Sequence, residues 1–211
     1  PARALVHKFG VWLVGLDRDE ALVAEANRRS LIEDVDKKAV FHAADYETLA
    51  LKPSGYDAIL CRNVFSTVVN REGMIEQFAE GLKPSAHLVV VDFVIGETKG
   101  NEAVLKRLFE GETPKLQPIR AQQITQSLKQ RNFLIHVAKD ITDEVMPRIL
   151  EGWARFAQAL KPGVTPRFTA EIILDEAAKW ETRMQALQSG ALRVYRFHAT
   201  NSAEKKKGRV A

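Results

Sequence analysis

Two carboxylates in this chain occupy positions from which they could bind a sugar. Asp17 ends the short apolar run at residues 11–16. Asp45 ends a second such run, at residues 39–44. A carboxylate at the carboxyl end of a strand in a doubly wound sheet can accept hydrogen bonds from both hydroxyls of a ribose. The same side chains could instead cap the turn or helix that follows them. Both interpretations are open at this point.

A third polar group follows the next apolar run. Arg62 and Asn63 come directly after residues 56–61, and Phe65 lies two positions further on. Ligands of open α/β sheets bind outside the carboxyl ends of the strands, so we expect these residues to border the same ligand as the two carboxylates. Phe65 is a candidate for one wall of that site.

The histidines and the cysteine favour structural over catalytic roles. None of the five histidines falls at the carboxyl end of a predicted strand, and they are scattered along the sequence: His7, His42, His87, His136 and His198. Cys61 sits inside a buried run without a histidine partner nearby in sequence, which is typical of a packed thiol. The acidic residues do not cluster at ligand spacing, so no metal site is predicted.

The elements that must position these residues alternate between strand and helix. Residues 11–17 form a run that is too short for a stand-alone helix and predict a strand buried on both faces. The next helix is predicted at Asp19–Val35, where acidic residues suit its positive end. The rhythm continues with strands at 39–45, 56–63 and 87–94 and a helix at 71–82. This order predicts an α/β fold with a doubly wound, mostly parallel sheet and right-handed crossovers.

The second half of the chain adds helices to this sheet. Apolar residues recur at helical spacing in two segments, which predict an inserted helical pair at about residues 143–190, between the last two strands. Residues 192–200 alternate with period two and predict a half-exposed, antiparallel closing strand. Trp153 and Trp180 lie on the apolar faces of the inserted helices. They either pack those helices or, in the case of Trp153, line an acceptor pocket.

Composition bounds the class of protein. The 211 residues are 45% hydrophobic and 27% charged, as in a single ordinary globular domain, which we place at residues 1–200. No run approaches the ~20 apolar residues of a membrane span, and no secretory signal opens the chain. With one cysteine there is no intrachain disulfide, which favours a reducing, cytoplasmic location.

The net charge of +4 comes from the end of the chain. We expect residues 201–211 to form a disordered basic tail. Residues 205–209 alone carry four positive charges, so the rest of the chain is about neutral. Nucleic acid is therefore not an expected partner.

The order of these segments resembles the class I S-adenosylmethionine-dependent methyltransferases. The segment Val-Gly-Leu-Asp ending at Asp17 is similar to the one whose acid holds the cofactor ribose. Ala-Asp-Tyr-Glu around Asp45 is similar to the one whose Asp receives the adenine amino group. The stretch at 56–65 resembles the strand and loop beside the methionine part of the cofactor. The resemblance covers residues 1 to about 94, with weaker support from the final strand.

The resemblance implies a Rossmann-like fold, S-adenosyl-L-methionine as cofactor and a set of cofactor-binding residues. These residues are Asp17, Arg18, Asp45, Tyr46, Arg62 and Asn63. Phe65 and Trp153 would belong to the substrate pocket. The inserted helices are similar to those of small-molecule and lipid methyltransferases, which implies a small acceptor, lipid-like ones included.

Two features depart from the family pattern. Ser85-Ala86 stands where a pair of glycines is usual, and no G-x-G sequence occurs in the chain. In the family, the first strand and its glycine-rich turn would precede Pro1. We therefore expect the natural gene product to extend upstream of this residue.

The sequence thus favours methyl transfer to a small-molecule acceptor. Methyl transfer from a sulfonium needs alignment more than a strong base, and no catalytic residue is assigned. A nicotinamide-dependent oxidoreductase is the first alternative, because an acid after the second strand also suits that ribose. Against it, no Tyr is followed four residues later by Lys. A non-catalytic binding or scaffold protein is the second alternative, should the chain be complete as given.

Overall fold

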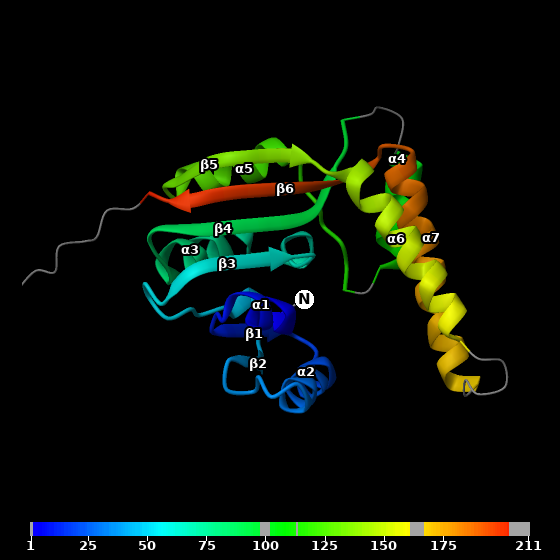
Figure 1. Cartoon of the computed structure of the whole chain (residues 1–211). Coiled ribbons are helices and arrows are strands. Elements are labelled where there is room, and N and C mark those ends of the chain that lie inside the picture. Colours follow the sequence, from blue (N-terminus) through cyan, green and yellow to red (C-terminus); the bar gives the residue numbers. More distant parts are fainter. Residues whose placement is uncertain (1, 98–101, 113, 161–166, 203–211) are drawn as a thin grey trace, which may run out of the picture. The chain divides into compact units, whose positions relative to one another are not determined.

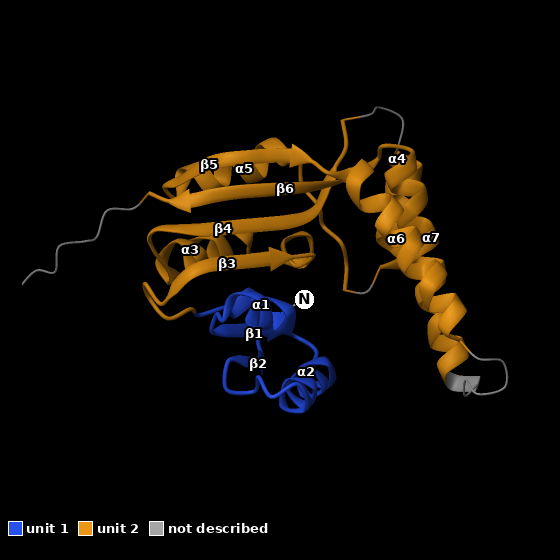
Figure 2. Ribbon diagram, viewed as in Figure 1, with its two compact units in different colours: residues 1–50 blue, residues 51–211 orange. Residues whose placement is uncertain are grey.

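The computed structural model describes residues 2–97, 102–112, 114–160 and 167–202 (Figure 1). The chain divides into two compact units, Pro1–Ala50 and Leu51–Ala211 (Figure 2). Each unit has its own sheet: two strands in the first and four in the second. No helix among the described residues is long and apolar enough to cross a membrane.

The first unit is a small α/β layer. Its elements are α1 (Ala2–Phe9), β1 (Leu13–Asp17), α2 (Glu20–Ile32), β2 (Ala39–Ala43) and the 3₁₀ turn η1 (Tyr46–Thr48). β1 and β2 are parallel. The amide of Asn27 on α2 exchanges two hydrogen bonds of 2.9 Å with the backbone N–H and C=O of Phe41, which ties α2 to β2.

The predicted strand at 11–17 is shorter than expected and is not buried on both faces. It begins at Leu13, and the side chains of Trp12 and Val14 are 76% and 53% exposed. Leu13 and Phe41 pack against a core of three buried residues, Val6, Val35 and Ala39. The helices of this unit therefore bury one face of β1, which explains the exposure of the other.

The second unit is a mixed sheet with helices. Its strands are β3 (Tyr56–Arg62), β4 (Leu82–Ile95), β5 (Phe133–Asp140) and β6 (Leu192–Asn201), in the order β3-β4-β6-β5. Its helices are α3 (Arg71–Gly81), α4 (Glu102–Gly111), α5 (Ala121–Gln130), α6 (Thr142–Ala159) and α7 (Arg167–Gln188), with the 3₁₀ turn η2 (Phe65–Thr67). β3 and β4 are parallel, and β6 is antiparallel to both of its neighbours.

This arrangement confirms the predicted fold class, including the antiparallel last strand. α6 and α7 lie between β5 and β6 in sequence and side by side in space, as expected of the inserted pair (Figure 1). β6 extends to Asn201, whose side-chain amide donates hydrogen bonds to the carbonyls of Ala79 and Leu82. Residue 201 therefore belongs to the sheet, while residues 203–211 of the predicted tail lie outside the described part of the chain.

The core of the second unit lies on both sides of β6. Val90 of β4 pairs with Phe197 of β6, and each is 1% exposed. At the other end of the strand, Leu192 and Val194 join a cluster with Leu108 of α4 and Leu187 of α7. Residues of α4 and α7 therefore pack around the first residues of β6.

Candidate functional site

Asp17 lies at the carboxyl end of β1 and does not cap the following helix, α2. The neighbouring residue Asp19 caps that helix instead. The Asp19 carboxylate accepts hydrogen bonds from the N–H groups of Ala21 and Leu22 at 2.9 and 3.0 Å, so Asp19 caps α2. Asp17 Oδ1 accepts one bond from Asp19 N at 3.0 Å. Its Oδ2 accepts none from the residues that the structure describes, so one oxygen is available to a ligand.

Arg18 and Tyr46 are brought together beside Asp17. The Arg18 guanidinium lies 4.8 Å from the centroid of the Tyr46 ring, a cation–π contact. The Tyr46 hydroxyl donates to the carbonyl of Leu16 at 3.2 Å, and only 8% of the residue is exposed. The ring is therefore held against the end of β1, next to the available carboxylate.

Asp45 serves as a cap in addition to any role toward a ligand. Its Oδ1 accepts a hydrogen bond from Glu47 N at 2.9 Å and begins η1. The side chain is exposed at the carboxyl end of β2. The first unit thus gathers four of the predicted residues at the ends of its two strands.

The remaining predicted cofactor residues belong to the second unit. Arg62 ends β3, and Asn63 follows it with a φ of +54°, a left-handed conformation that Asn tolerates better than most residues. The backbone N–H of Asn63 donates to the carbonyl of Val91 at 3.0 Å. The loop after β3 is therefore fixed to the neighbouring strand.

A buried carboxylate that was not among the predicted site residues supports this loop. Asp92 on β4 has no exposed surface, and its Oδ2 accepts a hydrogen bond from Phe65 N at 2.8 Å. Its Oδ1 accepts from Phe93 N at 2.8 Å. Burial raises the pKa of Asp92, although these hydrogen bonds act in the opposite direction. In the sequence, the feature that could have indicated this supporting role is the presence of an acidic residue inside the apolar run 87–94.

The two predicted pocket aromatics lie in packed surroundings. Phe65 is 2% exposed, so its ring belongs to the interior of the second unit. Trp153 is half-buried on α6 and meets the ring of Phe156 edge-on, with 5.8 Å between centroids. Neither side chain lines the large cavity of this unit, which has a volume of about 850 Å³ and opens beside the carboxyl end of β4 and the start of α5.

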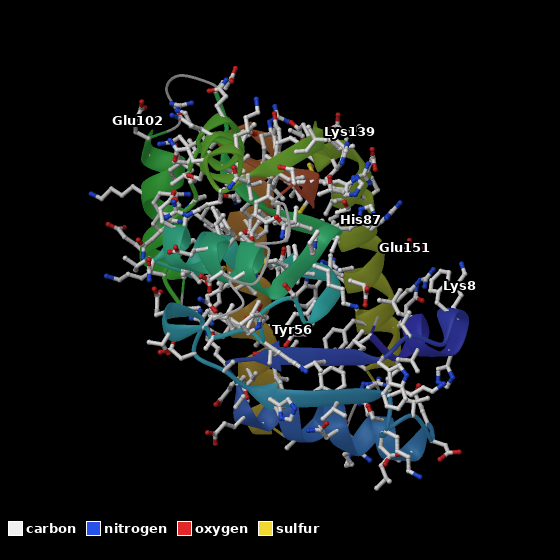
Figure 3. All side chains as sticks on the ribbon, turned by 90° about the vertical axis from the view of Figure 1, so that its left-hand side faces the viewer. Lys8, Tyr56, His87, Glu102, Lys139 and Glu151 are labelled. Atoms are coloured by element: carbon white, nitrogen blue, oxygen red, sulfur yellow. The ribbon has the colours of Figure 1, made fainter. Side chains whose placement is uncertain are left out.

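Three of the histidines that are distant in sequence meet on the sheet of the second unit. His87 on β4, labelled in Figure 3, lies 3.0 Å from His198 on β6, measured from Nδ1 to Nε2. His136 on β5 contacts Thr200 at 2.9 Å, and its ring centroid is 5.2 Å from that of His198. Burial lowers the pKa of His198, and the two neighbouring imidazoles lower it further. Within the described ranges no group of three or more His, Cys, Asp or Glu residues is arranged to hold a metal ion.

The sequence profile of a family described as "Methyltransferase domain" matches residues 4–156. The match takes in the ends of β1, β2 and β3, where the predicted cofactor residues lie. The chain belongs to this methyltransferase family. The resemblance to class I S-adenosylmethionine-dependent methyltransferases is thereby confirmed at the level of family and fold.

Similar proteins include other methyltransferases. The 27-O-demethylrifamycin SV methyltransferase of Amycolatopsis mediterranei is 24% identical over 157 residues, which are 74% of this chain and 58% of that protein. Phosphoethanolamine N-methyltransferase 2 of Haemonchus contortus, solved in complex with S-adenosyl-L-methionine, matches with a TM-score of 0.81 and 16% identity over 96% of this chain and 46% of its own. Geranyl diphosphate C-methyltransferase of Streptomyces coelicolor matches with a TM-score of 0.71 and 12% identity, over 94% and 66% respectively. The chain therefore spans about half the length of the first two.

Proposed function

We propose that this methyltransferase transfers a methyl group from S-adenosyl-L-methionine to a small-molecule acceptor. The observation that carries the proposal is the family match across the three strand ends that hold the polar residues. It favours methyl transfer over the hydride transfer of a nicotinamide-dependent enzyme and over a scaffold role. The relatives named above, whose names include small molecules, support a small acceptor.

In this proposal the first unit binds the nucleoside part of the cofactor. Asp17 accepts hydrogen bonds from the ribose hydroxyls through its available oxygen, and Arg18 lies beside it. Asp45 and Tyr46 contribute to the adenine side. The residues fit such a ligand because they combine a free carboxylate oxygen with an immobilised aromatic ring at the carboxyl ends of parallel strands.

The second unit borders the methionine part and the acceptor through the loop that begins with Arg62 and Asn63. The cofactor supplies a methyl group that is already activated by the sulfonium. The protein's residues then have to bind, align the acceptor in line with the methyl group and exclude water. No strong base is required when the acceptor is itself nucleophilic.

The first test is calorimetry with S-adenosylhomocysteine on the wild-type chain and on Asp17→Ala. We expect binding by the wild type and a loss of affinity of about 10- to 100-fold in the variant, because charge-assisted hydrogen bonds contribute about 1.5–3 kcal/mol. Asp36→Ala is the matched control: it removes a carboxylate from the same unit, in the turn before β2 and not at the carboxyl end of a strand. Equal affinity in wild type and Asp17→Ala would refute the role of Asp17. Binding of NAD but not of S-adenosylhomocysteine would refute the proposed function.

A further inference from the structure

The large cavity of the second unit lies where four elements meet. The end of β4 and the residues after it form one wall, the exposed side of α5 forms another, and the adjoining ends of β5 and β6 form the third. Its volume of about 850 Å³ is within the range of small-molecule sites. Because β6 is antiparallel, its first residues lie at the same edge as the carboxyl ends of β4 and β5.

The lining of the cavity divides into an apolar and a charged part. Val94, Ile95 and Ala138 provide apolar surface, and Tyr195 adds an aromatic ring. The charged lining residues are Arg120, Lys129 and Arg193 against Glu97 and Asp140. The cavity can therefore hold an organic molecule that carries a charge at one end.

The two carboxylates are already engaged by donors of the protein. Asp140 Oδ1 accepts hydrogen bonds from the backbone N–H and the hydroxyl of Thr142, at 2.8 and 2.5 Å, at the start of α6. The Glu97 carboxylate accepts one from Gln122 Nε2 at 3.2 Å. These bonds engage Asp140 Oδ1 and Glu97 Oε1, whereas Asp140 Oδ2 forms an ion pair with Arg193.

The cations of the cavity retain donors for a ligand. Arg193 Nε is 3.8 Å from Asp140 Oδ2, too far for a hydrogen bond. Among the described residues, Arg120 donates once, to the carbonyl of Gly96 at 3.4 Å, out of five N–H groups. Lys129 makes no ion pair with the residues that the structure describes. Arginine forks suit carboxylate and phosphate groups in particular.

We propose that this cavity binds a small organic anion, a carboxylate or a phosphate ester. Arg120 and Arg193 hold the anionic group, and the apolar lining contacts the body of the molecule. The first turn of α5, which begins at the cavity, adds its positive dipole to this end.

The test is an NMR titration of the isotope-labelled full chain with four probes. Phenyl phosphate and benzoate are the acidic probes, benzylamine is the cationic control, and inorganic phosphate represents the free ion. We expect selective binding of the two acidic organic probes, with shifts at Gly96 and Ala121. Arg120→Gln and Arg193→Gln should each lower the affinity for phenyl phosphate by about tenfold. Lys106→Gln, which removes an exposed cation of α4 that does not line the cavity, should leave binding unchanged.

Three results would overturn the inference: benzylamine binding as tightly as benzoate, inorganic phosphate binding as tightly as phenyl phosphate, or full affinity in both arginine variants. Thermal denaturation of each variant shows whether it is folded, and the exposed Arg120 is the safer of the two substitutions. S-adenosylhomocysteine calorimetry separates this inference from the proposed function. Cofactor binding without selective binding of acidic probes refutes the anion site alone, and the reverse result refutes the methyl-donor role alone.

Discussion

At the scale of single residues, Asp92 matters most for the geometry of the candidate site. Its two oxygens hold the backbone on either side: Phe65 in the loop after β3 and Phe93 in its own strand. Burying a carboxylate without partners would cost several kcal/mol, and these two donors offset part of that cost. We therefore treat Asp92 as a positioning residue for the loop that begins at Asn63.

The corresponding prediction concerns Asp92→Asn. Asparagine keeps one acceptor oxygen but turns an N–H₂ group toward a backbone donor, so we expect a loss of about 1 kcal/mol in the free energy of unfolding at neutral pH. Urea denaturation measures this loss. Asp57→Asn, at a side chain that is 84% exposed on β3, should change stability by less than about 0.5 kcal/mol. A fully stable Asp92→Asn protein would contradict the positioning role.

The same comparison has a defined pH dependence. Because the pKa of Asp92 is raised in the folded state, its contribution to stability is complete below the ordinary Asp pKa of ~3.9 and is lost as pH rises through the folded value. Asparagine does not titrate. The destabilisation caused by Asp92→Asn should therefore be largest near the ordinary Asp pKa and should decline as pH rises. If the destabilisation caused by Asp92→Asn grew as pH rises, the pKa of Asp92 would be lowered in the folded state and not raised.

The sequence was sufficient to place single residues at the ends of strands. It was not sufficient to predict which groups those residues contact in the folded protein. Asp17 and Asp45 could be placed at strand ends because each follows an apolar run. That Asp19, and not Asp17, caps α2 depends on backbone angles that the sequence does not state. The packing of Phe65 in the interior could not be predicted either, because its burial depends on β4 and η2, which come together only in the fold.

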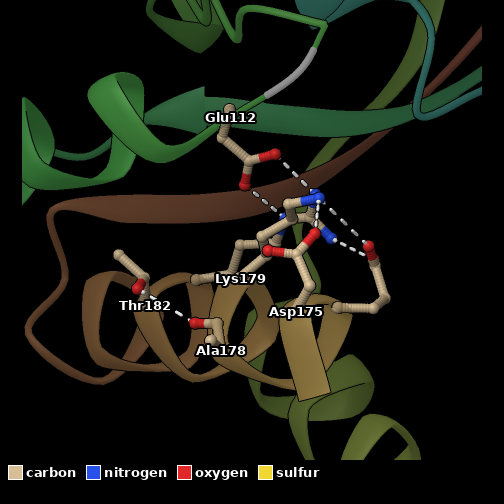
Figure 4. A network of polar contacts seen from close by, with 7 residues as sticks. Glu112, Asp175, Ala178, Lys179 and Thr182 are labelled. Atoms are coloured by element: carbon tan, nitrogen blue, oxygen red, sulfur yellow. Dashed lines mark hydrogen bonds and ion pairs between the residues drawn. The ribbon is translucent and has the colours of Figure 1, made fainter. Parts of the chain in front are cut away.

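At the scale of elements, a buried ion pair joins the segment after α4 to α7. Arg183 Nε and one terminal N–H₂ each donate to a Glu112 oxygen at 2.5 Å, and the Glu112 side chain is 3% exposed (Figure 4). The guanidinium also lies 4.7 Å from the centroid of the Trp180 ring. Glu176 approaches the same arginine at 3.5 Å. The pair therefore links α7 to the segment that directly follows α4.

We predict that Glu112→Ala lowers the free energy of unfolding by about 3–5 kcal/mol, because it leaves Arg183 largely buried without its main partner. Chemical denaturation followed by circular dichroism measures the change. The double variant Glu112→Leu with Arg183→Met should be less destabilised than the sum of the two single changes. Glu110→Ala, which breaks an exposed pair with Lys106, provides the control and should cost less than about 1 kcal/mol. Additive effects in the double variant would argue against a coupled pair.

Element boundaries were predictable where periodicity is strong. The helix at 71–82 and the inserted pair differ from α3, α6 and α7 by a few residues, because their apolar spacing is set locally. The place of β6 between β4 and β5 and the Glu112–Arg183 pair are long-range features. Nothing local connects two residues 71 positions apart.

At the scale of the whole molecule, the two units differ in the size of their cores. The first has about 50 residues and a cluster of three buried side chains, whereas the second buries residues on both sides of a four-stranded sheet. Small units bury a smaller fraction of their surface and are correspondingly less stable. The strand–helix rhythm predicts the α/β fold class, which the structure confirms, but the grouping of the strands into a two-stranded and a four-stranded sheet depends on hydrogen bonds between residues that are distant in sequence.

Hydrogen exchange tests this difference. Amides of β1 and β2 should be less protected than those of β4 and β6, because local opening of the first unit exposes little apolar surface. If residues 1–200 act as a single domain, as we expect, saturating S-adenosylhomocysteine should increase protection in both units, by an amount that follows its dissociation constant. Protection confined to one unit would refute the single-domain expectation.

The reaction of the Cys61 thiol can report local opening of the second unit. It is the chain's one cysteine, it lies on β3 directly before the loop of the candidate site, and it is 7% exposed. Burial raises its thiol pKa, so the folded form is a poor nucleophile. A thiol reagent then reacts at the rate at which β3 separates from its surroundings, and a bound ligand that steadies this strand slows the reaction. Ligand screening thus needs neither an engineered label nor a known reaction.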